Sequence, residues 1–363
     1  MRIFASTPFY LQGPGALGRV GEITGRHGTR PAIIIDALVR PLVGQTLEDG
    51  FVGSVDIRPF AGEVTEAAVV ALADTVGGCD VVVAVGGGKA LDAGKAVALR
   101  RGLPVICVPT IASTDGPASR GIALYDDHHR LVRVEQLPAN PVAVIVDTAV
   151  IAGAPVRFLR AGIGDAVAKM FEAEGCWAGG GLTKHGTRPT HSARAIATAA
   201  YGLLRAHAVA AVAAVEHHQL TEDLEATVEA TVLLSAMGFE NGGLSIAHST
   251  TRGLMTLRGA RDRLHGEHVA YGTLVQIAVE DGPDQGIHGD RLADVARFLH
   301  AVGLPTCLVD LGVDDVTRDE LQTMAGAIMA SPHIGNVARP VTQAHLLAAL
   351  TTLEARAAAG WVS

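Results

Sequence analysis

Residues 81–95 read VVVAVGGGKALDAGK: five apolar residues run directly into three glycines, and a helix-compatible stretch follows. A short run of Val and Ala without polar interruption predicts a strand that is buried on both faces. Glycines at positions 86–88 let the backbone approach a ligand closely, and the free N–H groups at a helix start suit a pyrophosphate. The spacing fits neither the Walker motif nor GxGxxG. It therefore predicts either a phosphate-binding turn or a tight strand-to-helix turn without a ligand.

Four further apolar runs of the same kind lie in the first 150 residues, with helical stretches between them. They are short, rich in Val and Ile, and end near Asp, Gly, Pro or Thr: 31–35, 55–57, 104–108 and 142–146. Continuous apolar strands separated by helices predict a parallel α/β sheet. Ligands of such sheets bind beyond the carboxyl ends of the strands, so the residues directly after each run are candidates for a binding site.

The sequence changes character after about Asp147, where strand-like runs give way to long Ala/Leu/Glu segments with helical periodicity. A chain of 363 residues also exceeds the length at which one hydrophobic core stops growing. We therefore predict an α/β domain over 1–157 and an all-helical domain over 158–363. The segment 179–191, rich in Gly, Thr and His, is expected to be an exposed loop.

Composition excludes several classes of protein. Hydrophobic residues make up 48% of the chain and its net charge is −8, which argues against disorder and against nucleic-acid binding. The N-terminus lacks the apolar region of a secretory signal, and no stretch reaches the roughly 18 apolar residues of a membrane span; the closest, 206–215, predicts a buried helix. Four cysteines without CxxC pairing indicate reduced thiols. We expect a cytoplasmic protein without membrane or nucleic-acid partners.

Polar residues follow two of the predicted strands. Asp36 closes the run 31–35, where a carboxylate either binds a ribose and favours NAD over NADP, or caps the next helix. The stretch 109–119, PTIASTDGPAS, follows the run 104–108 and brings hydroxyls and one carboxylate to the same edge. These side chains lie where a cofactor or substrate is expected, although the stretch is also an ordinary turn sequence.

Three segments of the helical half place metal-ligand residue types among small residues. Asp165 lies in GIGDAVAK, His248 in NGGLSIAH, and His265 opens HGEHVAYG. One carboxylate and two imidazoles suit zinc or iron(II) and leave coordination positions for a substrate oxygen. The alternative is that each side chain is capped, paired or solvated, as isolated Asp and His residues in helices usually are.

Five of these segments together resemble the glycerol dehydrogenase branch of the iron-containing (group III) alcohol dehydrogenase family. They are GGGKALDAGK, VPTIASTDGPAS, APVRFLRAGIGDAVAK, FENGGLSIAH and HGEHVAYGTLVQ, which occur in the order of the family across nearly the whole chain. The resemblance implies a dehydroquinate synthase-like architecture, with an N-terminal dinucleotide-binding domain, a helical metal-binding domain, and a cleft that holds NAD and the metal. It also implies a homo-oligomer.

The resemblance further implies the site residues. Asp165, His248 and His265 would be the metal ligands. The cofactor would be held by Asp36 at the ribose, by Gly86, Gly87, Gly88 and Lys89 at the pyrophosphate, and by Thr110, Ser113 and Thr114 at its central part. Asp115 would face the substrate, and His268 is a candidate to carry the released proton. The reaction would be hydride transfer from a metal-bound alkoxide to NAD, as in an NAD-dependent alcohol or polyol dehydrogenase.

The chain departs from the family at a few positions. Lys169 stands where many iron-type members carry a fourth ligand, a histidine, and because an ammonium cannot ligate we expect zinc. Arg252 replaces an asparagine; it either binds a carboxylate, phosphate or hydroxyl array of the substrate, or is a surface arginine. We predict a glycerol-like polyol, a cyclitol or an aminocyclitol as substrate. The alternatives are a glycerol-1-phosphate dehydrogenase and a sugar-phosphate cyclase of the dehydroquinate synthase type.

Overall fold

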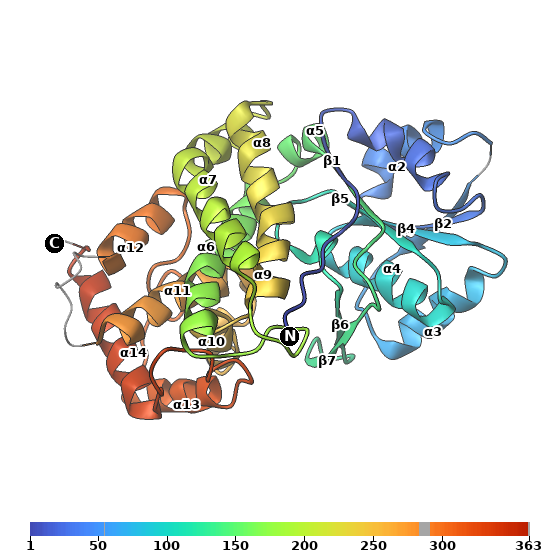
Figure 1. Ribbon diagram of the computed structural model, residues 1–363. Helices are drawn as coiled ribbons and strands as arrows, with labels where there is room; N and C mark the ends of the chain where they lie inside the picture. Colours follow the sequence, from blue (N-terminus) through green and yellow to red (C-terminus); the bar gives the residue numbers. More distant parts are fainter. Residues whose placement is uncertain (54, 283–290, 362–363) are drawn as a thin grey trace. The chain divides into compact units, whose positions relative to one another are not determined.

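The structure, a computed structural model, describes residues 1–53, 55–282 and 291–361 (Figure 1). Contacts divide the chain into two compact units. One consists of 5–158 and 213–236, and the other of 1–4, 159–212 and 237–363. The change from strands to helices therefore falls close to residue 158, while residues 213–236 return to the unit that contains the sheet.

The first unit is built on a six-stranded sheet in which every recorded pair of strands is parallel. Its order is β1-β8-β5-β4-β2-β3, and a separate antiparallel pair joins β6 and β7. The strands are β1 (Tyr10–Gly13), β2 (Pro31–Asp36), β3 (Asp56–Phe60), β4 (Val81–Gly86), β5 (Val105–Pro109), β6 (Gly121–Tyr125), β7 (Leu131–Gln136) and β8 (Ala143–Asp147). The predicted parallel α/β sheet is confirmed, and the five apolar runs correspond to β2, β3, β4, β5 and β8.

The central strands are buried because helices cover them. All residues of β4, β5 and β8 are buried, and the register places Val83 beside Ile33 on one side and Ile106 on the other. Each fully buried Val or Ile contributes about 1.5–3 kcal/mol. Gly94 of α4 (Gly88–Arg101) would collide with the Cβ of Ala84 if it carried a side chain, so glycine allows this helix to lie close to β4.

The remaining helices of the sheet-containing unit are short. They are α1 (Val20–Thr24), α2 (Arg40–Asp49), α3 (Glu66–Thr75), α5 (Thr148–Ala152) and α8 (Glu222–Glu229), with 3-10 turns at Ala16–Arg19 and Gly116–Ala118 and a π-helix at Ala230–Leu234. The second unit is helical. It contains α6 (Val156–Ala178), α10 (Ile246–Leu254), α11 (His265–Asp281), α12 (Arg291–Ala301), α13 (Arg318–Met329) and α14 (Gln343–Ala358), with a 3-10 turn at Arg258–Ala260. Most of α7 (His191–Glu216) and α9 (Ser235–Gly242) also belongs to it.

Helix α7 is long and apolar enough to cross a membrane by length and composition alone, which is weak evidence because core helices pass the same test. Only 33% of the most apolar 18-residue stretch of this helix is buried. Leu204 and Ala208 lie on the buried side, whereas Val209 is 49% exposed. The prediction of a buried helix over 206–215 is therefore correct for the side that carries Ala208 and wrong for the side that carries Val209.

Candidate functional site

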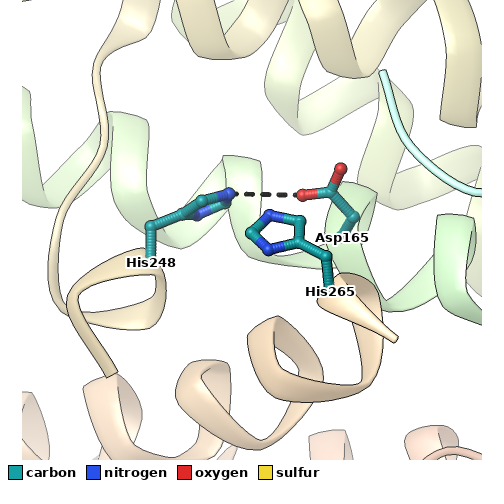
Figure 2. Close-up of side chains that lie close together, drawn as sticks. All are labelled: Asp165, His248 and His265. Atoms are coloured by element: carbon teal, nitrogen blue, oxygen red, sulfur yellow. Dashed lines mark ion pairs between the residues drawn. The ribbon is translucent and has the colours of Figure 1, made fainter. Parts of the chain in front are cut away.

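Three helices of the second unit bring the predicted metal ligands together. Asp165 lies within α6, His248 in the first turn of α10, and His265 is the first residue of α11. One ligand atom from each of the three lies within 4.8 Å of the others, and Nε2 of His248 is 3.3 Å from Oδ1 of Asp165. Figure 2 shows the carboxylate and the two rings directed toward one another. The structure thus brings together three residues that are far apart in the sequence.

Small residues allow these helices to approach. Ala168, Ala247 and Val269, one from each of the three helices, form a buried apolar cluster. A Cβ at Gly266 would collide with the carbonyl oxygen of Ala161, and one at Gly272 with that of Ala247. The Gly- and Ala-rich segments around the ligands therefore set the backbone spacing that the site requires.

A carboxylate that the sequence analysis did not single out supports His248. Glu172 is fully buried, and its Oε1 accepts the backbone N–H groups of Ser245 at 2.8 Å and His248 at 3.0 Å. Its Oε2 lies 2.6 Å from Nδ1 of His248. A proton held at Nδ1 leaves the lone pair of Nε2 for a metal ion. The signal in the sequence is the seven-residue spacing between Asp165 and Glu172, which is two helical turns on one face.

Burial and charged neighbours set the protonation of the three side chains. Burial lowers the pKa of His265 to about 4, although the charge of Asp165 opposes this, so the ring is neutral at pH 7. Burial alone would raise the pKa of Asp165, but the Lys169 ammonium and the two histidines hold it far below its usual range. Burial also opposes protonation of His248, yet Glu172 raises the pKa of that ring. An ionised carboxylate beside two imidazole nitrogens is a donor set that fits a divalent metal ion.

Lys169, the residue in place of a fourth ligand, is also part of this cluster. It lies one turn after Asp165 on α6 and is 1% exposed. Its Nζ forms an ion pair with Oδ1 of Asp165 and lies 3.2 Å from Nε2 of His248. The same ammonium is 5.7 Å from the ring centroid of Phe239.

The predicted cofactor residues gather at the carboxyl edge of the sheet. Gly86 ends β4 with φ of 143°, Gly87 caps α4, and a Cβ on Gly86 would lie 2.8 Å from that of Asp36. The Oγ1 atom of Thr110 is buried and has no hydrogen-bond partner among the residues that the structure describes. A buried hydroxyl without a partner at this edge fits a bound dinucleotide, which would supply acceptors.

Two of these residues make contacts that the sequence did not suggest. Oδ1 of Asp36 accepts the N–H of Leu38 at 2.9 Å, so the carboxylate closes a turn, whereas the N-cap of α2 is Val39. Lys89 is exposed, and its Nζ lies 2.9 Å from Oε2 of Glu63.

A buried lysine forms hydrogen bonds to the backbone of the loop after β5. Lys95 of α4 donates to the carbonyl oxygens of Gly116 and Gly121, which fixes both ends of the turn that follows Asp115. Asp115 is itself buried, and its Oδ2 accepts the Ser235 hydroxyl at 2.9 Å. Ser113 and Thr114, which precede it, are half-buried. No pattern in the sequence singled out Lys95 for this contact.

The two remaining predicted residues lie on α10 and α11. His268 is buried, and its Nε2 lies 2.7 Å from the carbonyl oxygen of Ala260. Arg252 is exposed, and its Nη1 donates to the carbonyl oxygen of Ala330 at 3.2 Å. Both side chains therefore have backbone partners within the helical unit.

Comparison with known proteins accounts for this arrangement. Residues 11–155 match the family model of the iron-containing alcohol dehydrogenases. A glycerol dehydrogenase of Escherichia coli is 39% identical over 335 residues, or 91% of this chain and 90% of its own. A glycolaldehyde reductase of Halobacterium salinarum is 36% identical over 90% of this chain and 89% of its own.

Solved structures agree with the sequence matches. The crystal structure of glycerol dehydrogenase from Schizosaccharomyces pombe superimposes with a TM-score of 0.93 at 31% identity, covering 100% of this chain and 94% of the other. NAD and a metal ion are the cofactors expected from these matches. The resemblance seen in the sequence is confirmed: the chain belongs to the glycerol dehydrogenase branch of the iron-containing alcohol dehydrogenase family and is an NAD-linked polyol oxidoreductase.

Proposed function

We propose that Asp165, His248 and His265 hold a zinc ion and that the enzyme oxidises a glycerol-like polyol to the matching ketone. The observation that carries the proposal is the convergence of three donor atoms within 4.8 Å, one of them oriented by a buried carboxylate. Three protein ligands with nitrogen and oxygen donors leave positions for a substrate oxygen, as in catalytic zinc sites. Lys169 occupies the position of a fourth ligand with a group that cannot ligate as an ammonium, which favours zinc over iron(II).

We assign each group of the candidate site a separate role in the reaction. When bound, the metal supplies Lewis-acid polarisation of the substrate hydroxyl and NAD accepts the hydride. Glu172 holds the proton at Nδ1 of His248 and keeps that ring in one orientation. Asp115 is proposed to orient the substrate, and Ser235 holds its carboxylate.

The cofactor is proposed to lie along the carboxyl edge of the sheet. In this proposal Asp36 binds the adenosine ribose, and Gly86, Gly87 and Gly88 provide close backbone approach to the pyrophosphate, with Lys89 beside it. Thr110, Ser113 and Thr114 contact the central part. The buried Oγ1 of Thr110 supports this placement.

The substrate class rests on the relatives and on Arg252. Named relatives act on glycerol and on glycolaldehyde, both small hydroxylated molecules. The Arg252 guanidinium is exposed and donates to the backbone of Ala330, which gives glycerol-1-phosphate less support than the sequence alone did. His268 is assigned to the proton path only as a secondary candidate, because its Nε2 is engaged by Ala260.

Assembly and location are proposed from the same resemblance. We propose a cytoplasmic homo-oligomer; four free cysteines agree with a reducing compartment. Light scattering after gel filtration would measure the oligomeric state, and a monomer at micromolar concentration would contradict this part of the proposal.

The function is tested by NADH formation with zinc-loaded, iron-loaded and chelator-treated enzyme. The substrates to compare are glycerol, 1,2-propanediol, inositols, aminocyclitols, glycerol-1-phosphate and 2-hydroxy acids. We expect zinc-dependent turnover of a polyol and its loss in Asp165→Asn, with the exposed Asp315→Asn as matched control. Turnover confined to glycerol-1-phosphate, or turnover that survives in Asp165→Asn, would overturn the proposal.

A further inference from the structure

Lys169 places a positive charge inside the candidate metal centre. Its ammonium is bonded to Oδ1 of Asp165 and lies 3.2 Å from Nε2 of His248, and these are the donor atoms assigned to the metal. The two donor atoms are themselves 3.3 Å apart. The ammonium therefore contacts both donors at once, as a cation bound between them would.

Two buried carboxylates compensate the charge of Lys169, and an aromatic ring nearby offers its ammonium a second favourable contact. The carboxylates of Asp165 and Glu172 both lie on the same helix and are buried with it. On another side, the ring of Phe239 lies 5.7 Å from its Nζ, close enough for a cation–π contact. A lysine stem has four rotatable carbons, so the ammonium can leave the donors and remain near this ring.

A metal ion and the ammonium cannot share the two donors. Zinc lies about 2.0–2.2 Å from carboxylate oxygen and imidazole nitrogen, so an ion that ligates both atoms takes the space in which the ammonium meets them. A metal ion and an ammonium that both contact the same two donor atoms would also repel each other strongly where water is excluded. Binding of the metal therefore requires the ammonium to move away.

We propose that Lys169 is an internal cation that competes with the metal for Asp165 and His248 and thereby weakens metal binding, withdrawing toward Phe239 when the metal is bound. This inference rests on the proposed metal centre.

The test is the zinc affinity of the chelator-treated full chain, measured by competition with a chromophoric chelator. Lys169→Met keeps an unbranched side chain without charge. The control is Lys184→Met, because the Lys184 ammonium lies 5.8 Å from the same Phe239 ring. We expect Lys169→Met to bind zinc about tenfold or more tightly than the wild type, and Lys184→Met to be unchanged. Equal or weaker binding by Lys169→Met would overturn the inference.

Two further measurements separate folding from metal binding. In chelator, Lys169→Met is expected to melt at a lower temperature than the wild type, and zinc is expected to raise its melting temperature by more. The cobalt(II) absorption spectra of the two proteins should coincide; a change in band position or intensity would overturn the inference by showing that Lys169 ligates. If Lys169→Met does not fold, Lys169→Gln takes its place. Zinc binding that is unaffected in Asp165→Asn would instead refute the metal centre itself.

Discussion

The Oε2 atom of Glu172 lies 2.6 Å from Nδ1 of His248. The other ring nitrogen of this histidine is 3.3 Å from Asp165, and the second oxygen of Glu172 accepts two backbone N–H groups at the start of α10. One buried carboxylate therefore fixes both the beginning of the helix and the orientation of the ring that the helix carries. The geometry of the candidate metal centre depends on this carboxylate although it touches neither Asp165 nor His265.

Glu172→Gln tests that dependence. A carboxamide has one acceptor oxygen, so either the two backbone N–H groups or Nδ1–H of His248 loses its acceptor. We expect zinc affinity to fall about 10- to 100-fold and the free energy of unfolding to fall by about 1–3 kcal/mol. Chelator competition and denaturant unfolding measure the two effects.

Glu174→Gln is the matched control, because Glu174 lies on the same helix but pairs with Arg194 in a partly exposed ion pair. It should leave zinc affinity unchanged. Wild-type affinity in Glu172→Gln would show that Glu172 does not position His248.

Gly88→Ala tests the cofactor edge without disturbing the fold. A Cβ at Gly88 meets no atom within 4 Å, and the residue opens α4, where alanine is a better helix former. We expect unchanged or slightly higher thermal stability, together with a rise of about tenfold in the KM for NAD, because the methyl group takes space beside the pyrophosphate.

The control for this substitution is Gly77→Ala, at an exposed glycine whose added Cβ also meets nothing within 4 Å. It should alter neither quantity. An unchanged KM for NAD in Gly88→Ala would remove this turn from the cofactor site.

The buried strands and the edge strand β3 could be predicted from the sequence, but the edge strand β1 and the antiparallel pair β6–β7 could not. Strands β4, β5 and β8 are buried throughout, so nearly every residue in them is apolar. Strand β1 reads YLQG and is half-buried, and β7 is almost wholly exposed, so neither shows a continuous apolar run. The return of residues 213–236 to the sheet-containing unit was also hidden, because a helix that crosses between units looks the same in sequence as one that does not.

For the candidate site, residue types could be predicted but contacts could not. Residue types alone make Asp165, His248 and His265 a candidate metal site with an open alternative, because the first and the last are 100 positions apart; the family resemblance implies that they meet. Glu172 was overlooked because its value comes from His248, which lies on another helix. Likewise, the pairing of Lys89 with Glu63 depends on a tertiary contact that no local pattern encodes.

Asp36→Asn tests coenzyme preference. The asparagine side-chain oxygen can still accept the N–H of Leu38, so the turn after β2 is kept while the negative charge is lost. Because that charge repels the 2′-phosphate of NADP, we expect the ratio of kcat/KM for NAD to that for NADP to fall about tenfold. Asp49→Asn, on the exposed side of α2, is the control. A ratio equal to that of the wild type would leave Asp36 with only its role in the turn.

Glu354→Gln tests how a half-buried carboxyl group on α14 affects stability. Its Oε1 accepts the Tyr271 hydroxyl at 2.8 Å, and its oxygens lie 3.2–3.3 Å from the N–H of Leu308. Burial raises the pKa of Glu354, although these two hydrogen bonds partly oppose the shift. A glutamine reproduces the protonated form, since its oxygen can accept the same bonds without a charge.

The direction of the pH dependence follows from the raised pKa. Between the unfolded-state pKa of about 4.3 and the higher folded-state value, the folded protein binds more protons at this site. The stability contributed by Glu354 is therefore fully present below the unfolded-state pKa and is lost as the pH rises through the folded-state pKa. As the pH rises from 4 to 7, the free energy of unfolding of Glu354→Gln should increase relative to that of the wild type. The free energy of unfolding of the exposed Glu48→Gln should not change relative to the wild type over the same range. Urea unfolding of the chelator-treated proteins at several pH values measures the difference, and a constant or falling difference would mean that the carboxylate is well solvated in the folded protein.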